Sequence, residues 1–207
     1  DRAHKVSSLW CRLLCKLNGV EVEIDGLENI LYDKPQIFVS NHQRYFDIFA
    51  LSGYLPVQIR WVAKSSLFKI PFMGWAMKAS GYIPVERGDR KKAFEAFNKT
   101  LEKLKEGSSI IIFPEGTRSE DGNIGPFKKG SNLIASRSRC PMLPVTIIGS
   151  GQIIKKGSAV INPGSVQVVI SPLVEPRSDK KGNEEVLESI RETIVDIHQQ
   201  STRRGAN

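Results

Sequence analysis

The sequence predicts a single α/β domain in which a mixed, mostly parallel sheet is flanked by helices. Its 207 residues, 40% hydrophobic and 25% charged, suit one folded domain that buries roughly 70% of the surface of its unfolded chain. Short apolar runs of strand length alternate with longer segments of helical periodicity, as they do in layered α/β domains. Short strands near the two chain ends can pair antiparallel, so we expect a mixed sheet.

The first elements follow from the periodicity of apolar side chains. Residues 4–18 predict an amphipathic helix, because the following residues recur at helical spacing: Val6, Leu9, Trp10, Leu13, Leu14 and Leu17. The apolar face of this helix belongs either to the core or to a membrane surface. Residues 20–24 alternate apolar with acidic side chains and predict a strand, which the Asp25-Gly26 turn closes.

Strands and helices continue to alternate in the next part of the chain. Residues 36–40 predict a short buried strand, and residues 45–55 predict a helix that ends before Pro56. Residues 60–63 predict another strand.

A short helix at 72–79 and a strand at 82–85 follow. Residues 90–106 predict a helix with a charged outer face, which Gly107 terminates.

A long loop stands in the middle of the second half. The β-branched run 109–113 predicts a fully buried strand, and the polar, glycine-rich residues 114–129 predict a loop. Residues 130–139 then predict a helix. Long ordered loops are usually functional, so this one is a candidate site.

The chain closes with strands at 142–148 and 166–170 and an amphipathic helix at 183–200. In sheets of this kind, ligands bind beyond the carboxyl ends of strands. We therefore expect the chemistry to follow the strands at 36–40 and 109–113.

The net charge of +8 favours anionic partners: nucleic acid, a membrane surface, a phosphorylated substrate or an acidic carrier. Residues 60–92 alone contribute +6, from eight basic and two acidic residues. The same segment interleaves apolar side chains that include Trp61, Phe72 and Trp75. Aromatics beside cations suit a lipid headgroup boundary or the stacked bases of a single strand, although some of them must belong to the core.

Several kinds of site find no support in the sequence. Cys11, Cys15 and Cys140 lack paired spacing, which argues against a disulfide framework or a structural zinc site and for a reducing compartment. No metal site is predicted, and the Gly125–Ser131 segment lacks the lysine that a phosphate-binding loop requires. No apolar run reaches the ~18–20 residues of a membrane span, although a start at Asp1 leaves open an anchor upstream.

His42 and Asp47 follow the strand predicted at 36–40, with four residues between them. A neutral imidazole can accept a proton from a hydroxyl, while a carboxylate on its other nitrogen fixes the tautomer and stabilises the imidazolium. The structural alternatives are a helix cap for His42 and a first-turn acid for Asp47. No Gly-x-Ser-x-Gly elbow occurs, so such a base would activate a substrate hydroxyl directly.

The strand predicted at 109–113 leads into Phe113-Pro114-Glu115-Gly116-Thr117-Arg118-Ser119. Here a glycine lets the backbone approach a ligand closely, and Arg118 offers a bidentate fork to phosphate. The alternative is a turn with an exposed arginine. A third segment, Gly81 to Gly88, ends another strand with Arg87.

Together, these segments resemble the four ordered blocks of the glycerolipid acyltransferase family: Asn41-His42 through Asp47, Ile83 through Arg87, Phe113 through Ser119, and Leu143-Pro144-Val145. The resemblance runs from about residue 20 to 175 and is greatest to the 1-acylglycerol-3-phosphate (lysophosphatidic acid) acyltransferases. It implies a fold like that of glycerol-3-phosphate acyltransferase. Residues 1–18 would be a helix at a membrane interface, and residues 19–207 the acyltransferase domain.

The resemblance also implies roles. His42 would be the general base, oriented by Asp47, so that the sn-2 hydroxyl of lysophosphatidate attacks the thioester of an acyl-CoA or acyl-carrier protein without an acyl-enzyme. The product would be phosphatidic acid, and no cofactor beyond the acyl donor is expected. The residues implied to hold the glycerol phosphate or shape the pocket are Arg87, Glu115, Gly116, Thr117, Arg118 and Pro144.

Arg44 departs from the family, which more often has a small residue such as serine at this position. The added cation could bind the substrate phosphate, or it could indicate another acceptor, such as glycerol 3-phosphate or a different lysolipid. A basic nucleic-acid-binding module is the remote alternative, because no RNA- or DNA-binding signature appears in the sequence. We expect an enzyme associated with an anionic membrane surface on its cytoplasmic face.

Overall fold

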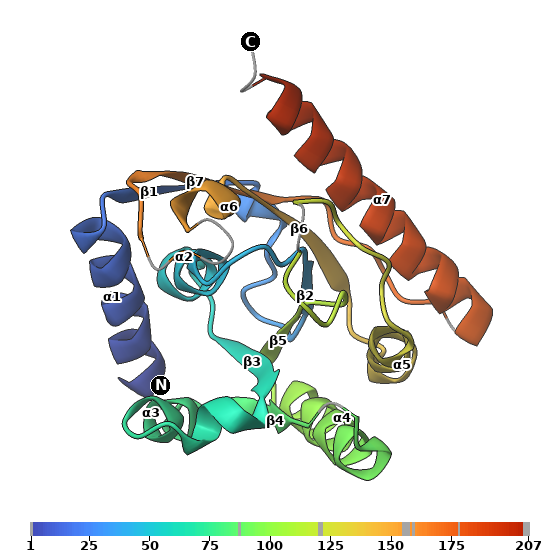
Figure 1. Ribbon diagram of the computed structural model, residues 1–207. Coiled ribbons are helices and arrows are strands. Elements are labelled where there is room, and N and C mark those ends of the chain that lie inside the picture. Colours follow the sequence, from blue (N-terminus) through green and yellow to red (C-terminus); the bar gives the residue numbers. More distant parts are fainter. Residues whose placement is uncertain are drawn as a thin grey trace.

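The computed structural model describes residues 2–86, 88–119, 122–154, 158, 160–177 and 179–204 (Figure 1). Its helices are α1 (Arg2–Leu17), α2 (Phe46–Tyr54), α3 (Met73–Ala79), α4 (Arg90–Lys105), α5 (Lys129–Ser138), α6 (Ser150–Ile153) and α7 (Lys180–Arg204). Its strands are β1 (Val20–Asp25), β2 (Ile37–Ser40), β3 (Ile59–Lys64), β4 (Ile83–Val85), β5 (Ser109–Ile112), β6 (Met142–Ile148) and β7 (Gly164–Ile170). Two 3₁₀ helices complete the described elements, η1 (Leu27–Asn29) and η2 (Ser65–Lys69).

The strands form one seven-stranded sheet in the order β1-β7-β6-β2-β5-β3-β4. All neighbouring strands are parallel except β6 and β7, where Val145 lies opposite Ile170 in an antiparallel pair. The prediction of a single α/β domain with a mixed, mostly parallel sheet is confirmed. Of the two strands near the chain ends, only β7 has an antiparallel neighbour, because β1 pairs parallel with β7.

Helices cover both faces of the sheet: α1 and α2 lie on one face, and α4, α5 and α7 lie on the other (Figure 1). The short central strands are apolar on both faces, as the unbroken apolar runs of the sequence require. In β2, Phe38 joins the cluster beneath α2, whereas Ile37 and Val39 join the cluster beneath α4 and α7. Because successive side chains of a strand point to opposite faces of the sheet, the four residues of β2 contribute to both hydrophobic cores.

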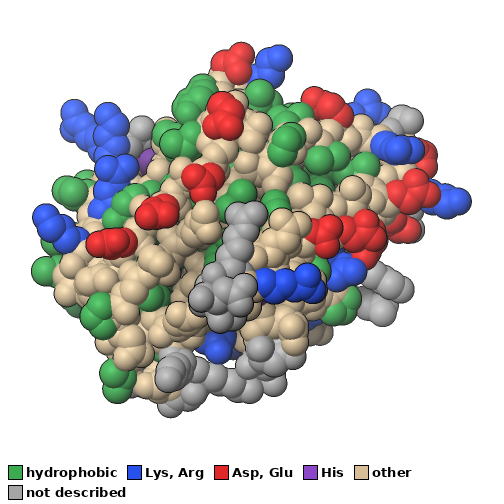
Figure 2. Space-filling view, turned by 90° about the horizontal axis from the view of Figure 1, so that it is seen from above, with side chains coloured by type: hydrophobic (Ala, Val, Ile, Leu, Met, Phe, Trp, Pro, Cys, Tyr) green, Lys and Arg blue, Asp and Glu red, His purple; other side chains and the backbone are tan. Residues whose placement is uncertain are grey.

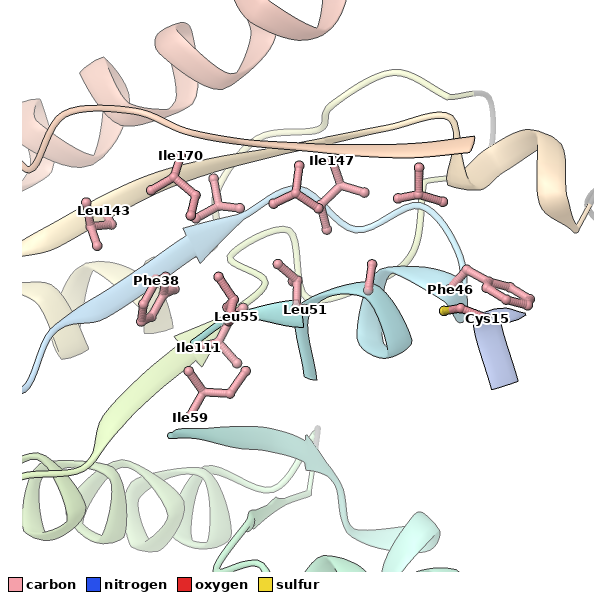
Figure 3. Close-up of a cluster of buried hydrophobic side chains, with 14 of the residues drawn as sticks. Cys15, Phe38, Phe46, Leu51, Leu55, Ile59, Ile111, Leu143, Ile147 and Ile170 are labelled. Atoms are coloured by element: carbon pink, nitrogen blue, oxygen red, sulfur yellow. The ribbon is translucent and has the colours of Figure 1, made fainter. Parts of the chain in front are cut away.

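The core between α2 and the sheet is shown in Figure 3. Leu51 from α2 and Leu55 directly after this helix meet Phe38, Ile111 and Leu143 from three neighbouring strands. Helix α2 carries buried side chains almost all round, because α1 packs over its outer side. This helix is therefore fixed in the middle of the molecule, with its first turn at the carboxyl end of β2.

The described elements match the predicted ones apart from short helical turns and some end positions. The turns η1, η2 and α6 were not expected, because single turns leave no periodic signal in a sequence. Strand β7 begins earlier than the predicted 166–170, and α7 extends at both ends beyond the predicted 183–200.

Candidate active site

The side chains of His42 and Asp47 form a hydrogen-bonded pair at the carboxyl end of β2. His42 Nδ1 lies 2.7 Å from Asp47 Oδ2. Because an ionised carboxylate can only accept, the neutral form of the ring carries its proton on Nδ1 and presents an unprotonated Nε2. Among the described residues, no serine or cysteine side chain forms a hydrogen bond with His42.

Asp47 is fixed by its own surroundings. It is fully buried in the first turn of α2, where a carboxylate is favoured by the helix dipole. Its Oδ2 also accepts hydrogen bonds from the backbone N–H of Gln43 at 2.6 Å and of Arg44 at 2.8 Å. Asp47 therefore has both of the roles considered from the sequence: it is an acid in the first turn of a helix, and it is the hydrogen-bond partner of His42.

An aromatic stack supports the imidazole from one side. The rings of His42 and Phe113 are stacked at 3.9 Å with an interplanar angle of 5°, and the Trp61 ring lies 5.4 Å from Phe113. Trp61 Nε1 donates to Ser52 Oγ, which ties the stack to α2. With Asp47 on one nitrogen and Phe113 on one face, the ring has little freedom to rotate.

Glu115 joins the two loops of the site instead of facing solvent. Its buried carboxylate accepts from the backbone N–H of His42 through Oε1 and from that of Gly125 through Oε2, both at 2.9 Å. Burial raises the pKa of Glu115, and the two N–H donors and the nearby His42 counteract this rise. Both carboxylate oxygens are therefore engaged with backbone, so Glu115 shapes the site through its loops.

Gly116, Thr117 and Arg118 form the rim of the same loop. Gly116 has a φ of +71°, and a Cβ added there would meet the Lys128 side chain at 2.9 Å. The Arg118 guanidinium lies 4.3 Å from the centre of the Tyr45 ring. Lys128 and Arg118 thus bring two cations to the rim of this loop.

Arg44 is tied to the backbone. Its Nη1 donates to the carbonyl oxygens of Gln43 at 2.7 Å and Ser119 at 2.8 Å, and its Nε donates to that of Ile154 at 3.1 Å. These contacts differ from the phosphate contact that the sequence left open for this residue.

Arg87 lies outside the described residues, and Pro144 does not join this group. Pro144 is buried inside β6, opposite Val39, and its carbonyl oxygen accepts from Ser171 N, so it lies within the sheet and not at the strand end.

Three supporting residues were missed by the sequence reasoning. Asn41 binds Ile147 at both backbone groups, with Nδ2 donating at 2.9 Å and Oδ1 accepting at 2.8 Å. Gln43 Nε2 lies 2.7 Å from His198 Nε2 of α7, and burial lowers the pKa of His198. For Asn41 and Gln43, a position beside His42 was the only sequence signal, since contacts over more than 100 residues leave no local pattern.

The described residues show no group of three or more His, Cys, Asp or Glu side chains placed to hold a metal ion. The arrangement can remove a proton from a hydroxyl at Nε2, stabilise the resulting imidazolium through Asp47, and offer cations to an anionic group nearby.

The chain matches the family model described as "Acyltransferase" over residues 21–148. It is 37% identical over 179 residues to a chloroplast 1-acyl-sn-glycerol-3-phosphate acyltransferase of Brassica napus, covering 85% of this chain and 52% of that protein. It is also 34% identical over 198 residues to the 1-acyl-sn-glycerol-3-phosphate acyltransferase of Pseudomonas aeruginosa, covering 91% of this chain and 76% of that protein. The chain thus spans about half the length of the chloroplast relative.

A solved structure has the same fold. The crystal structure of the 1-acyl-sn-glycerophosphate acyltransferase of Thermotoga maritima superimposes with a TM-score of 0.81 at 32% sequence identity. The match covers 94% of this chain and 79% of that one. The fold expected from the sequence resemblance is confirmed.

Proposed function

Since this chain belongs to the acyltransferase family, we propose that it transfers a fatty acyl group to the sn-2 hydroxyl of 1-acylglycerol 3-phosphate, giving phosphatidic acid. The observation that carries the proposal is the His42–Asp47 pair, whose Nε2 is available for a substrate hydroxyl. The names of the relatives support the acceptor.

In the proposed reaction, His42 Nε2 takes the proton of the acceptor hydroxyl as the oxygen attacks the thioester carbonyl carbon. The C–S bond then breaks, and the imidazolium returns the proton to the leaving thiolate. Asp47 holds the ring in the required tautomer and stabilises its positive charge. Direct transfer needs no enzyme nucleophile, in keeping with the lack of a serine or cysteine side chain hydrogen-bonded to the His42 ring in the described part of the chain.

The acyl donor is an acyl-CoA or an acyl-carrier protein, and no further cofactor takes part in the proposed reaction. The acceptor phosphate lies at the rim formed by Arg118 and Lys128. Arg118 supplies a planar fork and Lys128 a mobile point charge, which together suit a phosphate monoester.

We further propose that the enzyme works on a membrane surface, because α1 is folded with its apolar side outward. Its inner side packs on α2 through Cys11 and Cys15 and through hydrogen bonds from Ser8 and Arg12 to Gly53 O. Its outer side exposes a row of large apolar residues: Val6, Leu9, Trp10, Leu13 and Leu17. A helix of a purely soluble domain has the opposite arrangement.

A second apolar group follows β3 at the same end of the sheet as His42. Ile70, Phe72, Met73 and Trp75 are exposed there, with Phe72 78% accessible and packed edge-on against Trp75. Helix α3 contacts α1 (Figure 1). Seen from above, the side of the molecule on which α1 lies carries hydrophobic side chains and Lys and Arg side chains, with acidic side chains beside them (Figure 2).

Apolar side chains flanked by cations match the boundary of an anionic bilayer. A groove of about 600 Å³ runs between α1 and β1, lined by apolar residues that include Leu9 and Leu13, by the cations Arg12 and Lys16, and by one carboxylate, Glu21. No helix in the described ranges is long and apolar enough to span a membrane.

For the side of the membrane, we propose the cytoplasmic face. Cys11, Cys15 and Cys140 are free thiols, and burial raises the pKa of Cys11 and Cys15 to about 11. Unpaired thiols of this kind suit a reducing compartment.

The test is acyl transfer by the purified wild type and a His42→Ala variant, with lysophosphatidate, other lysolipids and glycerol 3-phosphate as acceptors. Each acceptor is supplied with acyl-CoA and with acyl-carrier protein. The wild type is expected to prefer lysophosphatidate, and His42→Ala should lose about 10²–10⁴ in turnover at an unchanged melting temperature. Turnover by His42→Ala close to that of the wild type would rule out the general base.

A further inference from the structure

Arg44 joins three loops that follow three different strands. Its guanidinium spans the His42 loop after β2 through Gln43 O, the loop after β5 through Ser119 O, and the segment after β6 through Ile154 O. The first two of these loops also meet at their backbones, where Ser119 N donates to His42 O at 2.8 Å. A single half-buried side chain therefore ties together the segments that surround the base.

The acceptors of Arg44 are neutral backbone carbonyls, which fix both the position and the plane of the guanidinium. Two of its three nitrogens are directed at protein atoms and away from a ligand. Arg118 is different, because it is exposed and lies over the exposed ring of Tyr45.

We infer that Arg44 is a positioning residue: it holds the three loops together as a clamp, so that His42 keeps its position relative to the rim formed by Arg118 and Lys128. These two cations, and not Arg44, bind the acceptor phosphate. This inference rests on the proposed function for its kinetic test. A serine at this position, which is more usual in the resembling family, reaches none of the three carbonyls. The same loops must then be held by other contacts, so Arg44 is a feature of this chain.

The backbone contacts of the clamp lie next to catalytic atoms. Arg44 N donates to the carboxylate oxygen that holds His42, and Gln43 O, an acceptor of Nη1, belongs to the residue after the base. A displacement of reacting groups by about 1 Å can cost up to 10²-fold in rate. Loss of the clamp should therefore lower turnover and leave the affinity for phosphate unchanged.

The experiment compares Arg44→Ser and Arg44→Lys with Arg118→Ala, and uses Arg137→Ser, an exposed arginine in the last turn of α5, as the matched control. Each variant is assayed with lysophosphatidate and with 1-acylglycerol, the same acceptor without its phosphate. Arg44→Lys keeps the charge but has no planar fork to span the three carbonyls.

Arg44→Ser and Arg44→Lys are expected to lower kcat by about 10- to 100-fold for both acceptors, with KM changed little. Arg118→Ala is expected to raise KM for lysophosphatidate only. The inference is overturned if the loss in Arg44→Ser disappears with 1-acylglycerol, because Arg44 would then contact the phosphate. Full activity of Arg44→Lys would overturn it as well, because charge alone would then suffice.

Backbone hydrogen exchange gives a readout that does not depend on the acceptor. Arg44→Ser should speed exchange in residues 41–45, 113–119 and 122–125 while the melting temperature stays close to that of the wild type. Unchanged exchange in these segments contradicts the clamp even if turnover falls. If the wild type acylates no acceptor, the proposed function fails and the exchange data alone decide on Arg44.

Discussion

At the scale of single residues, the site depends on one imidazole, whose position and orientation are fixed by three contacts. Asp47 accepts a hydrogen bond from Nδ1–H, Phe113 covers one face of the ring, and Glu115 accepts a hydrogen bond from the backbone N–H of the same residue, His42. The sequence supplied His42 and Asp47 from their spacing after a strand. It could not supply the stacking of Phe113, because β5 comes next to β2 only through the sheet.

Asp47→Asn is the sharpest substitution at this scale. The carbonyl oxygen of the new amide can still accept the three hydrogen bonds that reach Asp47 Oδ2, and the other oxygen, Oδ1, is buried without a partner among the described residues. The fold is therefore expected to survive, while the imidazolium loses its counter-charge. We expect turnover to fall by about 10²–10⁴, measured by acyl-transfer kinetics beside a melting curve. Near-wild-type turnover would show that Asp47 serves α2 alone.

At the scale of elements, α1 shows that the helical periodicity of a sequence predicts a helix but not the direction in which its apolar side faces. The spacing of its apolar residues predicted the helix, yet the sequence left open whether the apolar side faces the core or a membrane. Packing on α2 decided the orientation: the Gly53 backbone accepts the Ser8 and Arg12 bonds, and a Cβ at Gly53 would come within 3.3 Å of Cys11 Cβ. The small and polar side of α1 therefore faces inward.

The exposed row of α1 gives a direct test of membrane binding. Leu9→Gln and Leu17→Gln alter side chains that are 69% and 72% accessible, so the fold should be unaffected. Each is expected to weaken binding to vesicles of phosphatidylcholine and phosphatidylglycerol by about tenfold, because an apolar contact with lipid is lost. Cosedimentation measures the effect, with Tyr32→Gln, a similarly exposed residue before β2, as the control. Equal binding by all variants contradicts the membrane role of α1.

The turn from η2 into α3 depends on one glycine. A Cβ at Gly74 would clash with Phe68 O, so the backbone must move to accept any side chain. Gly74→Ala is expected to cost about 1–3 kcal/mol in unfolding free energy, measured by urea denaturation. Gly130→Ala is the matched control, because nothing lies within 4 Å of its added Cβ and alanine favours the helix α5. Equal stability of Gly74→Ala and wild type would refute the close approach.

At the scale of the whole molecule, two partly buried histidines are expected to lower the stability of the fold at acid pH. Burial lowers the pKa of His4 in α1 and of His198 in α7, with Arg60 adding to the effect at His4. The folded chain therefore binds fewer protons than the unfolded chain between about pH 6.5 and the lower pKa values of the folded state. The unfolding free energy should fall as the pH drops from about 6.5 to those values, by at most about 1.4 kcal/mol per pH unit for each histidine, and these two groups should add no further loss below them.

Urea denaturation between about pH 7.5 and 5.5 measures this slope before most carboxylates titrate. A His4→Gln, His198→Gln double variant should show a flatter profile over the same range. If its profile matches that of the wild type, the two histidines do not carry the acid sensitivity.

The distribution of charge was resolved only by the tertiary structure. Residues 60–92 hold most of the net charge, but Arg60 is buried and its pKa is lowered by burial, and Trp61 and Phe68 belong to the core. Lys69 and Lys78 remain at the surface around Ile70 to Trp75. Only part of residues 60–92 therefore belongs to the proposed membrane face.

The sequence by itself determined the order of strands and helices, the α/β class and the two loops that form the candidate site, because periodicity and turn residues act over a few neighbouring positions. It also determined the His-Asp pair, whose members lie within one strand-to-helix turn. Only the tertiary structure decided the contacts that make the pair a site: Phe113 on the ring, Glu115 across two loops, Arg44 on three carbonyls and Asn41 on β6. These contacts join residues far apart along the chain, and only the pairing of parallel strands brings them to one edge of the sheet.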